Sequence, residues 1–424
     1  MRDFGREDAI EAKPHEAFDE LMDGKERGQR REEEFAPVLD AREGDDTDGG
    51  QGGAADKVCC GGEAHRSIRS CTFGAAGKAT ILHGFLRPKA GATLFFSRYH
   101  RGDGSAMAKY LITGVAGFIG SALAEALLER GEDLRGIDNL STGKRANIEP
   151  FLKRMDFREA DLRDAAAMRE ACEGVEIIFH EGALPSVPRS VKDPATSHDS
   201  NINGTFSLLE AARAMGVRRI IYAASSSAYG NQPGMPRVES MMPAPIAPYP
   251  VQKLAGELYM KSYWQVYGME TACLRYFNIF GPRQTPDSPY SGVMAKFILQ
   301  MMRGETPTIF GTGEQGRDFT YIANAVSANL LAAAAPKEKI GGRTFNVACG
   351  GRHTLNETYG ILAALLNFRH APEYGPPRLG DVADSEAEIS AAREAFGYEP
   401  AVGFEEGLKR TVEWYRENYS LVAR

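Results

Sequence analysis

From residue 109 to the end, short apolar runs alternate along the chain with amphipathic segments. The apolar runs have strand length and predict buried strands over 110–113, 134–137, 157–162, 176–180 and 219–223. Helix-forming segments with apolar residues on one face lie between them, over 121–130, 165–172 and 201–215. Repeated strand–helix units predict an α/β fold with a doubly wound parallel sheet, which binds ligands at the carboxyl ends of its strands. Residues 184–189 are expected to form a rigid loop at that edge.

The loop between the first strand and the first helix carries a glycine at every third position, namely Gly114, Gly117 and Gly120. Glycines let the backbone approach a diphosphate closely, and the N–H groups and dipole of the following helix favour its negative charge. Asp138 ends the second strand, 18 residues past Gly120, where a carboxylate accepts hydrogen bonds from ribose hydroxyls and repels a 2′-phosphate. A surface aspartate is the alternative, but the order of strand, loop, helix and acid predicts a dinucleotide site that favours NAD over NADP.

Candidate chemistry follows the fifth strand. Three consecutive serines, 225–227, stand near its carboxyl end, and Tyr249 and Lys253 are four residues apart, so that they share one helix face. A nearby ammonium is expected to lower the pKa of the phenol from about 10 towards neutrality. Tyr249 would then take a proton from a substrate hydroxyl while NAD takes the hydride, with a serine bonded to the same oxygen. For a Tyr–Lys pair taken alone, an exposed helix face is the alternative.

Composition narrows the possible classes of protein. The 424 residues carry a net charge of −7, which argues against a general nucleic-acid binder. The six cysteines are too sparse for a disulfide scaffold, no apolar run approaches the ~20 residues of a membrane span, and the charged start is no signal peptide. We therefore expect a cytoplasmic protein without membrane contact. Cys59, Cys60, His65 and Cys71 match no usual zinc spacing, so no metal site is predicted.

Residues 1–106 differ from the rest of the chain because long stretches of them are polar and charged. Such a composition buries too little apolar surface to offset the loss of chain entropy, so a low-order N-terminal extension is expected. Met107 stands just before the first strand, and residues 107–424 are expected to contain a complete enzyme. Our hypothesis is that residues 1–106 are an appendage that is not part of the native protein.

Several stretches, taken in order, resemble the extended short-chain dehydrogenase/reductases, and among them the NAD-dependent nucleotide-sugar epimerases, especially the UDP-N-acetylglucosamine and UDP-glucose 4-epimerase groups. They run from about Lys109 to Tyr415 and are GVAGFIGS, DNLSTGKR, LPSVPRSVKDP, SSSAYG, YPVQK, LRYFNIFGPRQ, IFGTGEQGRDFTYI and PPRLGDV. The resemblance implies a Rossmann-type NAD-binding domain over 107–277, with returning segments about 318–348. It also implies a smaller C-terminal α/β region for the nucleotide sugar, over 278–317 and 349–424, and a homodimer formed through helices on the main sheet.

The resemblance further implies roles for individual residues around the cofactor. Tyr249 and Lys253 match the catalytic Tyr and Lys, and Ser225 matches the catalytic Ser/Thr, with Ser227 as the next candidate. Contacts with NAD are implied for Gly114, Gly117, Phe118, Ile119, Gly120, Asp138, Asn139, Thr142, Gly143, Asp161, Leu162, Ala183, Tyr249, Lys253 and Tyr276.

Contacts with a UDP-sugar are implied in the same way. They fall on Ser186, Ser225, Ser227, Tyr249, Asn278, Phe310, Arg317, Arg378, Asp381 and Ser385. Arg317 and Arg378 match a pair of arginines on the diphosphate, which suits the planar fork of the guanidinium group. Asn278 would also reach the diphosphate. Phe310 would hold the uracil, and Asp381 would lie near the uridine ribose.

The resemblance also bears on the reaction. Related dehydratases and decarboxylases carry acids where this chain has Ser226 and Ser227, which leaves epimerisation. Hydride would leave C4 for NAD, the 4-keto sugar would rotate, and hydride would return to its other face. At the gating position of the sugar pocket, the small Ser385 implies UDP-N-acetylglucosamine and UDP-N-acetylgalactosamine as substrates, with UDP-glucose and UDP-galactose also accepted. The alternatives are a UDP-glucuronate 4-epimerase, another nucleotide-sugar oxidoreductase or decarboxylase, and a non-catalytic NAD-sensing regulator.

A few positions depart from the family pattern: Gly182, Pro250, Gly316, Ala323 and Ala383-Asp384. Pro250 is compatible with the first turn of a helix, which does not need its N–H group. Ala383-Asp384 replaces a usual Arg-His pair, which leaves the charge beside Ser385 open.

Overall fold

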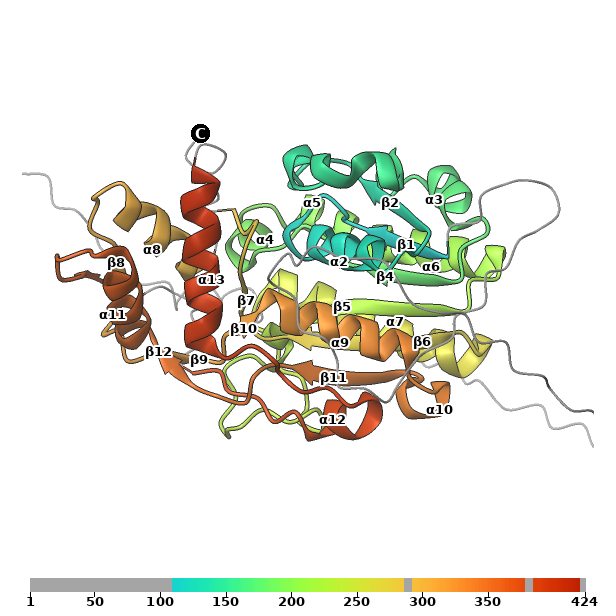
Figure 1. The fold of residues 1–424 in the computed structure, drawn as a ribbon. Helices are drawn as coiled ribbons and strands as arrows, with labels where there is room; N and C mark the ends of the chain where they lie inside the picture. Colours follow the sequence, from blue (N-terminus) through green and yellow to red (C-terminus); the bar gives the residue numbers. More distant parts are fainter. Residues whose placement is uncertain (1–108, 286–291, 378–383, 420–424) are drawn as a thin grey trace, which may run out of the picture. The chain divides into compact units, whose positions relative to one another are not determined.

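The computed structural model describes residues 109–285, 292–377 and 384–419 (Figure 1), and the expectations for residues 1–106 lie outside these ranges. Its centre is a seven-stranded sheet in the order β11-β6-β5-β4-β1-β2-β3, and all neighbouring strands are parallel. The strands are β1 (Tyr110–Thr113), β2 (Leu134–Asp138), β3 (Asp156–Glu159), β4 (Ile177–His180), β5 (Arg219–Ser225), β6 (Glu270–Tyr276) and β11 (Arg343–Val347). The strand order reverses between β1 and β4, where a doubly wound sheet binds its ligands. The predicted Rossmann-type fold is confirmed.

Helices cover both faces of this sheet (Figure 1). α2 (Phe118–Glu129) and α9 (Ile322–Ala334) pack together over one face. α3 (Ala165–Cys172), α6 (Gly204–Met215) and α7 (Pro248–Tyr267) pack over the other face. Because helices cover both faces, the strands are apolar along most of their length instead of alternating with polar residues.

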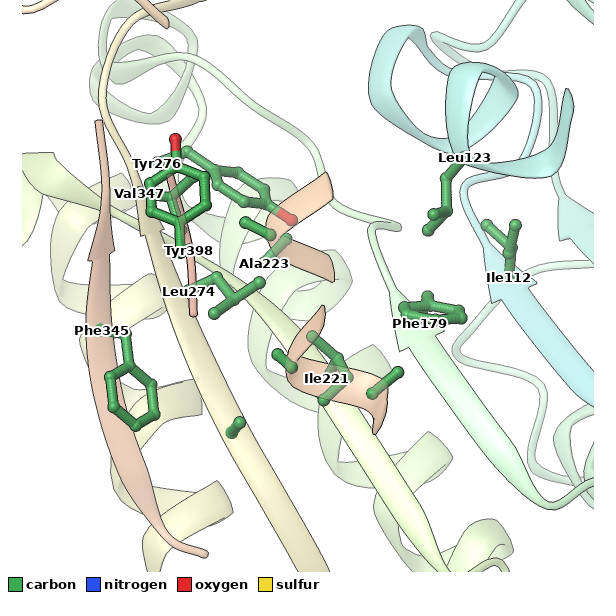
Figure 2. Close-up of a cluster of buried hydrophobic side chains, with 14 of the residues drawn as sticks. Ile112, Leu123, Phe179, Ile221, Ala223, Leu274, Tyr276, Phe345, Val347 and Tyr398 are labelled. Atoms are coloured by element: carbon green, nitrogen blue, oxygen red, sulfur yellow. The ribbon is translucent and has the colours of Figure 1, made fainter. Parts of the chain in front are cut away.

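Two hydrophobic clusters fill the space between the sheet and its helices. Figure 2 shows part of the first cluster, to which five neighbouring strands contribute Ile112, Phe179, Ile221, Leu274 and Phe345. On β1, β4 and β5, the residue one position earlier belongs to the second cluster, on the opposite face. Successive side chains of a strand point to opposite faces of the sheet, so each apolar run contributes residues alternately to the two clusters.

A third hydrophobic cluster lies among the segments that follow β6. These segments are β7 (Ile279–Phe280), α8 (Val293–Met302), β8 (Thr308–Phe310), β9 (Gly316–Arg317), β10 (Thr320–Tyr321), β12 (His353–Thr354), α11 (Leu355–Leu366), β13 (Glu373–Gly375) and α13 (Phe404–Glu417). The strands form the two-stranded pairs β10–β7, β12–β9 and β13–β8. Phe280 lies edge-on to Tyr321 and Phe404, with ring centroids 5.7 and 5.8 Å apart. Because β7 follows the carboxyl end of β6 directly, this cluster begins at the edge of the sheet where ligands are expected.

The remaining described elements are short: η1 (Arg145–Asn147), η2 (Glu149–Arg154), α4 (Val187–Lys192), α5 (Pro194–His198), η3 (Asp199–Asn203), η4 (Ser226–Tyr229), α10 (Lys337–Ile340) and α12 (Ser390–Phe396). The predicted rigid loop over 184–189 is wrong in part. Ser186 caps α4, and Pro188 fits its first turn, so the chain is already helical from Val187. The predicted helix over 201–215 begins as a π-helical turn, η3, before α6. Within the described ranges, every helix is too short or too polar to span a membrane.

Candidate active site

A cavity of about 650 Å³ lies at the carboxyl ends of the central strands. All the residues for which contacts with NAD are predicted line this cavity, from the glycine loop to Lys253 and Tyr276. Ser186, predicted to contact the substrate, lines it as well. The topology explains the gathering, because the loops after β1, β2, β4 and β5 all emerge at the same edge of a parallel sheet.

Gly114 and Gly120, the first and last glycines of the motif, have no room for a side chain. Gly114 has a φ of 69°, in the left-handed region, and a Cβ atom there would lie 2.7 Å from the Cα of Gly182. A Cβ atom on Gly120 would lie only 2.2 Å from the carbonyl oxygen of Gly114. Gly117 precedes the first residue of α2, and no side chain caps the helix there. The bare backbone at the start of α2 therefore fits the diphosphate of a dinucleotide.

Asp138 is the last residue of β2 and is held by the backbone around it. Its carboxylate accepts hydrogen bonds from the N–H groups of Ala116 (2.9 Å) and Leu140 (2.8 Å). A Cβ atom on Gly143 would lie 2.7 Å from the same carboxylate, so the loop closes tightly over it. Burial raises the pKa of Asp138, and the two backbone hydrogen bonds counteract this effect. A fixed acid at this edge fits the ribose of NAD and disfavours a 2′-phosphate.

A second acid lies beside Asp138 in the cavity wall. Asn139 donates a hydrogen bond to Asp161 over 2.8 Å. Arg163 also hydrogen-bonds Asp161 and holds the pKa of that carboxyl well below its usual range. Asn139 and Asp161, both predicted to contact NAD, are thus tied to each other across the loops after β2 and β3.

Ser225, Tyr249 and Lys253 come together although they lie on two different elements. Ser225 ends β5, and its hydroxyl is 2.8 Å from that of Ser227 and hydrogen-bonds Tyr249. Tyr249 lies in the first turn of α7, where its N–H donates to the hydroxyl of Ser190 over 3.0 Å. Lys253 lies one turn further and donates to the carbonyl oxygen of Ala223 over 2.7 Å. Pro250 occupies the first turn of α7, as expected.

The pKa values of this pair differ from the expectation that Lys253 brings Tyr249 towards neutrality. Burial raises the pKa of Tyr249 to about 12, the hydrogen bond from Ser225 lowers it, and the negative charge of Glu181 raises it further. Burial lowers the pKa of Lys253 to about 8, and the charges of Glu181 and Glu257 raise it. The physical reason is that withdrawal of the phenolate from water outweighs the neighbouring ammonium, which the carbonyl of Ala223 holds.

Glu181 is a site residue that the sequence reasoning missed. It follows β4 directly, lines the cavity, and accepts a hydrogen bond from the hydroxyl of Tyr276 over 2.7 Å. Burial raises the pKa of its carboxyl to about 7. Its position was the available signal, because an acid directly after an apolar strand lies at the same edge as Asp138.

Among the described residues for which contacts with the substrate are predicted, Ser186 and Tyr249 line the cavity and the others do not. Asn278, just after β6, has a φ of 39° and donates to the carbonyl of Asp318 (2.9 Å) and to the hydroxyl of Ser385 (3.0 Å). Arg317 lies on β9 and forms a parallel bridge with Ser385. Phe310 ends β8. Arg378 and Asp381 lie outside the described residues.

The structure accounts for two of the departures near Ser385. Asp384 accepts hydrogen bonds from the N–H of Gly316 and from Arg352, each over 2.8 Å. A Cβ atom on Gly316 would lie 2.3 Å from the Nε atom of Arg352, so the guanidinium group occupies the space of a side chain at position 316. Arg352 thus balances the negative charge that Asp384 brings next to Ser385.

The fold and the cavity together define a class of protein, the α/β enzymes that bind a dinucleotide and carry a Ser–Tyr–Lys set beside it. Comparison with known proteins narrows the class. The model of the NAD dependent epimerase/dehydratase family matches residues 110–348, and this chain belongs to that family as an NAD-dependent enzyme.

Individual members of the family resemble the chain over nearly their whole length. A UDP-glucose 4-epimerase of Thermotoga maritima, solved with UDP-glucose, has 38% identity and a TM-score of 0.70, covering 73% of this chain and 99% of that one. A UDP-N-acetylglucosamine 4-epimerase of Methanobrevibacter ruminantium M1, in complex with UDP-N-acetylmuramic acid, has 37% identity, the same TM-score and the same coverage. A UDP-glucuronate 4-epimerase of Thermodesulfobacterium geofontis is 33% identical over 327 residues, which is 74% of this chain and 98% of that protein.

Proposed function

We propose that this protein interconverts the two C4 epimers of a UDP-sugar. The observation that carries the proposal is that Ser225, Tyr249 and Lys253 meet beside the cavity that fits NAD. Ser226 and Ser227 follow Ser225, so this turn offers hydroxyls instead of the acid that an elimination requires. The similarity to several UDP-sugar 4-epimerases supports the proposal.

In this mechanism the side chains of β5 and α7 act on the C4 oxygen of the sugar. Tyr249 takes the proton of the C4 hydroxyl in the oxidation and returns it in the reduction, while Ser225 hydrogen-bonds the same oxygen. Lys253, held by the carbonyl of Ala223, supplies positive charge that favours the phenolate. NAD supplies the acceptor of the C4 hydride and then its donor. Because the cofactor ends in its initial state, no second substrate is consumed.

We propose UDP-N-acetylglucosamine and UDP-N-acetylgalactosamine as the preferred pair, with UDP-glucose and UDP-galactose also accepted. Support comes from Ser385, a small residue whose hydroxyl accepts a hydrogen bond from Asn278. In this proposal the N-acetyl group lies beside that small side chain. In this proposal Arg317 and Arg378 bind the diphosphate. Phe310 holds the uracil, and Asp381 lies near the uridine ribose.

The test is to incubate the purified protein separately with UDP-N-acetylglucosamine, UDP-glucose and UDP-glucuronate, and to read the products by NMR. The proposal predicts the C4 epimer of the N-acetylated sugar, without net NADH. Accumulation of NADH in proportion to product, or release of CO₂, would identify an oxidoreductase or a decarboxylase instead. If only UDP-glucuronate were epimerised, the proposed reaction would be supported and the proposed substrate would be wrong.

We also propose that two copies of the chain pair through α6 and α7. These neighbouring helices expose large apolar side chains on the outside of the sheet, namely Phe206, Leu258, Tyr259, Val266 and Tyr267. Phe206 and Tyr259 join the two helices, with ring centroids 5.6 Å apart. Leu258→Glu is expected to convert a dimer into a monomer in analytical ultracentrifugation, and an unchanged sedimentation coefficient would contradict this interface.

A further inference from the structure

The cavity holds an acid that the proposed reaction does not use. Glu181 lines the cavity near Tyr249, the proposed base, and Lys253, whose charge favours the phenolate of that base. Glu181 follows the end of β4, and its carboxyl is linked to residues of two other elements, Tyr276 on β6 and Asn329 on α9.

A chain of hydrogen bonds fixes this carboxyl in place. The amide of Asn329 donates to the hydroxyl of Tyr276 over 2.7 Å, and that hydroxyl donates to Glu181 over 2.7 Å. Asn329 is fully buried and also donates to the carbonyl of Ala325, so it has one orientation. Tyr276 lies at the carboxyl end of β6, in the cluster with Ala223 and Leu274 that Figure 2 shows. This series of hydrogen bonds therefore runs from Asn329 in the core to Glu181 in the cavity wall.

We propose that Glu181 is a positioning residue whose negative charge, oriented by Tyr276 and Asn329, sets the protonation of Tyr249 and Lys253 together. The charge stabilises the ammonium of Lys253 and opposes the phenolate of Tyr249. The other groups that face it do not compete: Tyr276 donates to it as a neutral phenol, and burial lowers the pKa of the adjacent His180 to about 3, so that this ring stays neutral. Glu257, on α7, also acts on Lys253 but is paired with Arg275.

The consequence is a displacement of the whole pH profile when the charge is removed. A nearby negative charge raises the pKa of Tyr249 and of Lys253 alike. Glu181→Gln keeps the shape of the side chain and removes the charge. The acid limb and the alkaline limb of the pH–rate profile, which together report Tyr249 and Lys253, should therefore both move to lower pH, by about one unit. A purely structural role would lower the rate and leave both limbs in place.

A second measurement does not depend on turnover. Burial raises the pKa of Glu181 from 4.5 to about 7, so the folded protein binds this proton more tightly than the unfolded chain. The wild-type protein should lose stability as the pH rises from about 4.5 through 7, whereas Glu181→Gln should not incur this loss. The melting temperature of the Gln variant, relative to wild type, should accordingly rise between pH 5 and pH 8.

The experiment compares Glu181→Gln, Tyr276→Phe and the control Glu176→Gln in the C4-epimerisation assay and in thermal melts across this pH range. Tyr276→Phe removes the hydrogen bond that lowers the pKa of Glu181, so it should displace the limbs in the same direction and less far. Glu176 precedes β4 at the opposite end of the strand, on the surface beside Arg218, and its neutralisation should leave the profile in place. The inference would be overturned if Glu181→Gln left both limbs of the pH–rate profile and the relative melting temperature unchanged. Because the kinetic arm rests on the proposed function, absence of C4 epimerisation in the wild-type protein would refute that function, and the melts would still test Glu181.

Discussion

The proposed cofactor-binding part of the site, the NAD end, and the proposed substrate-binding part, the sugar end, are built in different ways. The NAD end is made of backbone: bare glycines, the carboxyl ends of strands and the start of α2 define its shape. The sugar end is made of side chains that meet across long stretches of sequence, such as Asn278 and Ser385, which are 107 positions apart. Asp384 and Arg352, next to Ser385, are about 40% exposed. A change at the NAD end should therefore affect every sugar equally, whereas a change at the sugar end should affect one sugar more than another.

The largest effect is expected from Tyr249→Phe, which removes the proton acceptor and keeps the ring. Loss of a general base slows turnover by about 10²–10⁴-fold, and the factor should be the same for UDP-N-acetylglucosamine and UDP-glucose. Steady-state kinetics with both sugars measures it. Tyr259→Phe, on the same helix, is the control. It keeps the ring that packs against Phe206 in the proposed dimer contact and should keep full activity. A loss confined to one sugar would place Tyr249 at the sugar end instead.

The same contrast explains what the sequence predicts and what it does not. Gly114, Gly117, Gly120 and Asp138 lie close together in the sequence, on consecutive elements, so their spacing predicts a dinucleotide site. Glu181 was missed because its partner Tyr276 lies on another strand, 95 positions away. The prediction of a lowered pKa for Tyr249 was wrong for a related reason. A spacing of four residues shows that Lys253 is a neighbour of Tyr249, but it does not show how deeply Tyr249 is buried.

The departures from the family pattern near Ser385 also show that the sequence alone does not reveal which distant residues meet. Gly316 and Asp384 each depart from the family pattern. In the fold they belong with Arg352, which fills the space over Gly316 and pairs with Asp384. Only the structure brings these three positions together. The segment between Gly316 and Arg352 forms β10, α9, α10 and β11, and the segment between Arg352 and Asp384 includes β12, α11 and β13.

The next effect in size is expected from Gly120→Ala. The added Cβ atom would lie 2.2 Å from a backbone oxygen that cannot turn away, and overpacking of this kind costs about 1–3 kcal/mol. The protein should retain less NAD after purification, melt at a lower temperature, and lose activity on both sugars by one common factor. Gly360→Ala is the matched control, since nothing lies near its added atom on α11 and alanine favours a helix. If Gly120→Ala retained full NAD content, the loop would not bind the diphosphate as proposed.

Ser385→Tyr should lower the activity on one of the two sugars more than on the other. The larger side chain would occupy the space proposed for the N-acetyl group, so activity on UDP-N-acetylglucosamine should fall at least about tenfold, while UDP-glucose remains a substrate. The assay is kcat/KM for each sugar under identical conditions. Ser385→Ala, which stays small and loses the hydrogen bond from Asn278, should keep the N-acetylated reaction. An equal loss on both sugars with Tyr would mean that position 385 supports Asn278 and does not select the sugar.

The smallest effect is expected from Arg352→Ala. Its pair with Asp384 is exposed at about 40% on each side, and such surface pairs contribute up to about 1 kcal/mol. Overall stability should therefore change little, as in the control Arg410→Ala, which breaks another exposed pair on α13. The local effect should be specific, because Asp384 would keep its bond to Gly316 and present an unbalanced negative charge beside Ser385. We expect KM for UDP-sugars to rise up to about fivefold, with kcat and NAD content unchanged. Reduced NAD content in this variant would show that the two ends of the site are coupled, against the independence that their construction predicts.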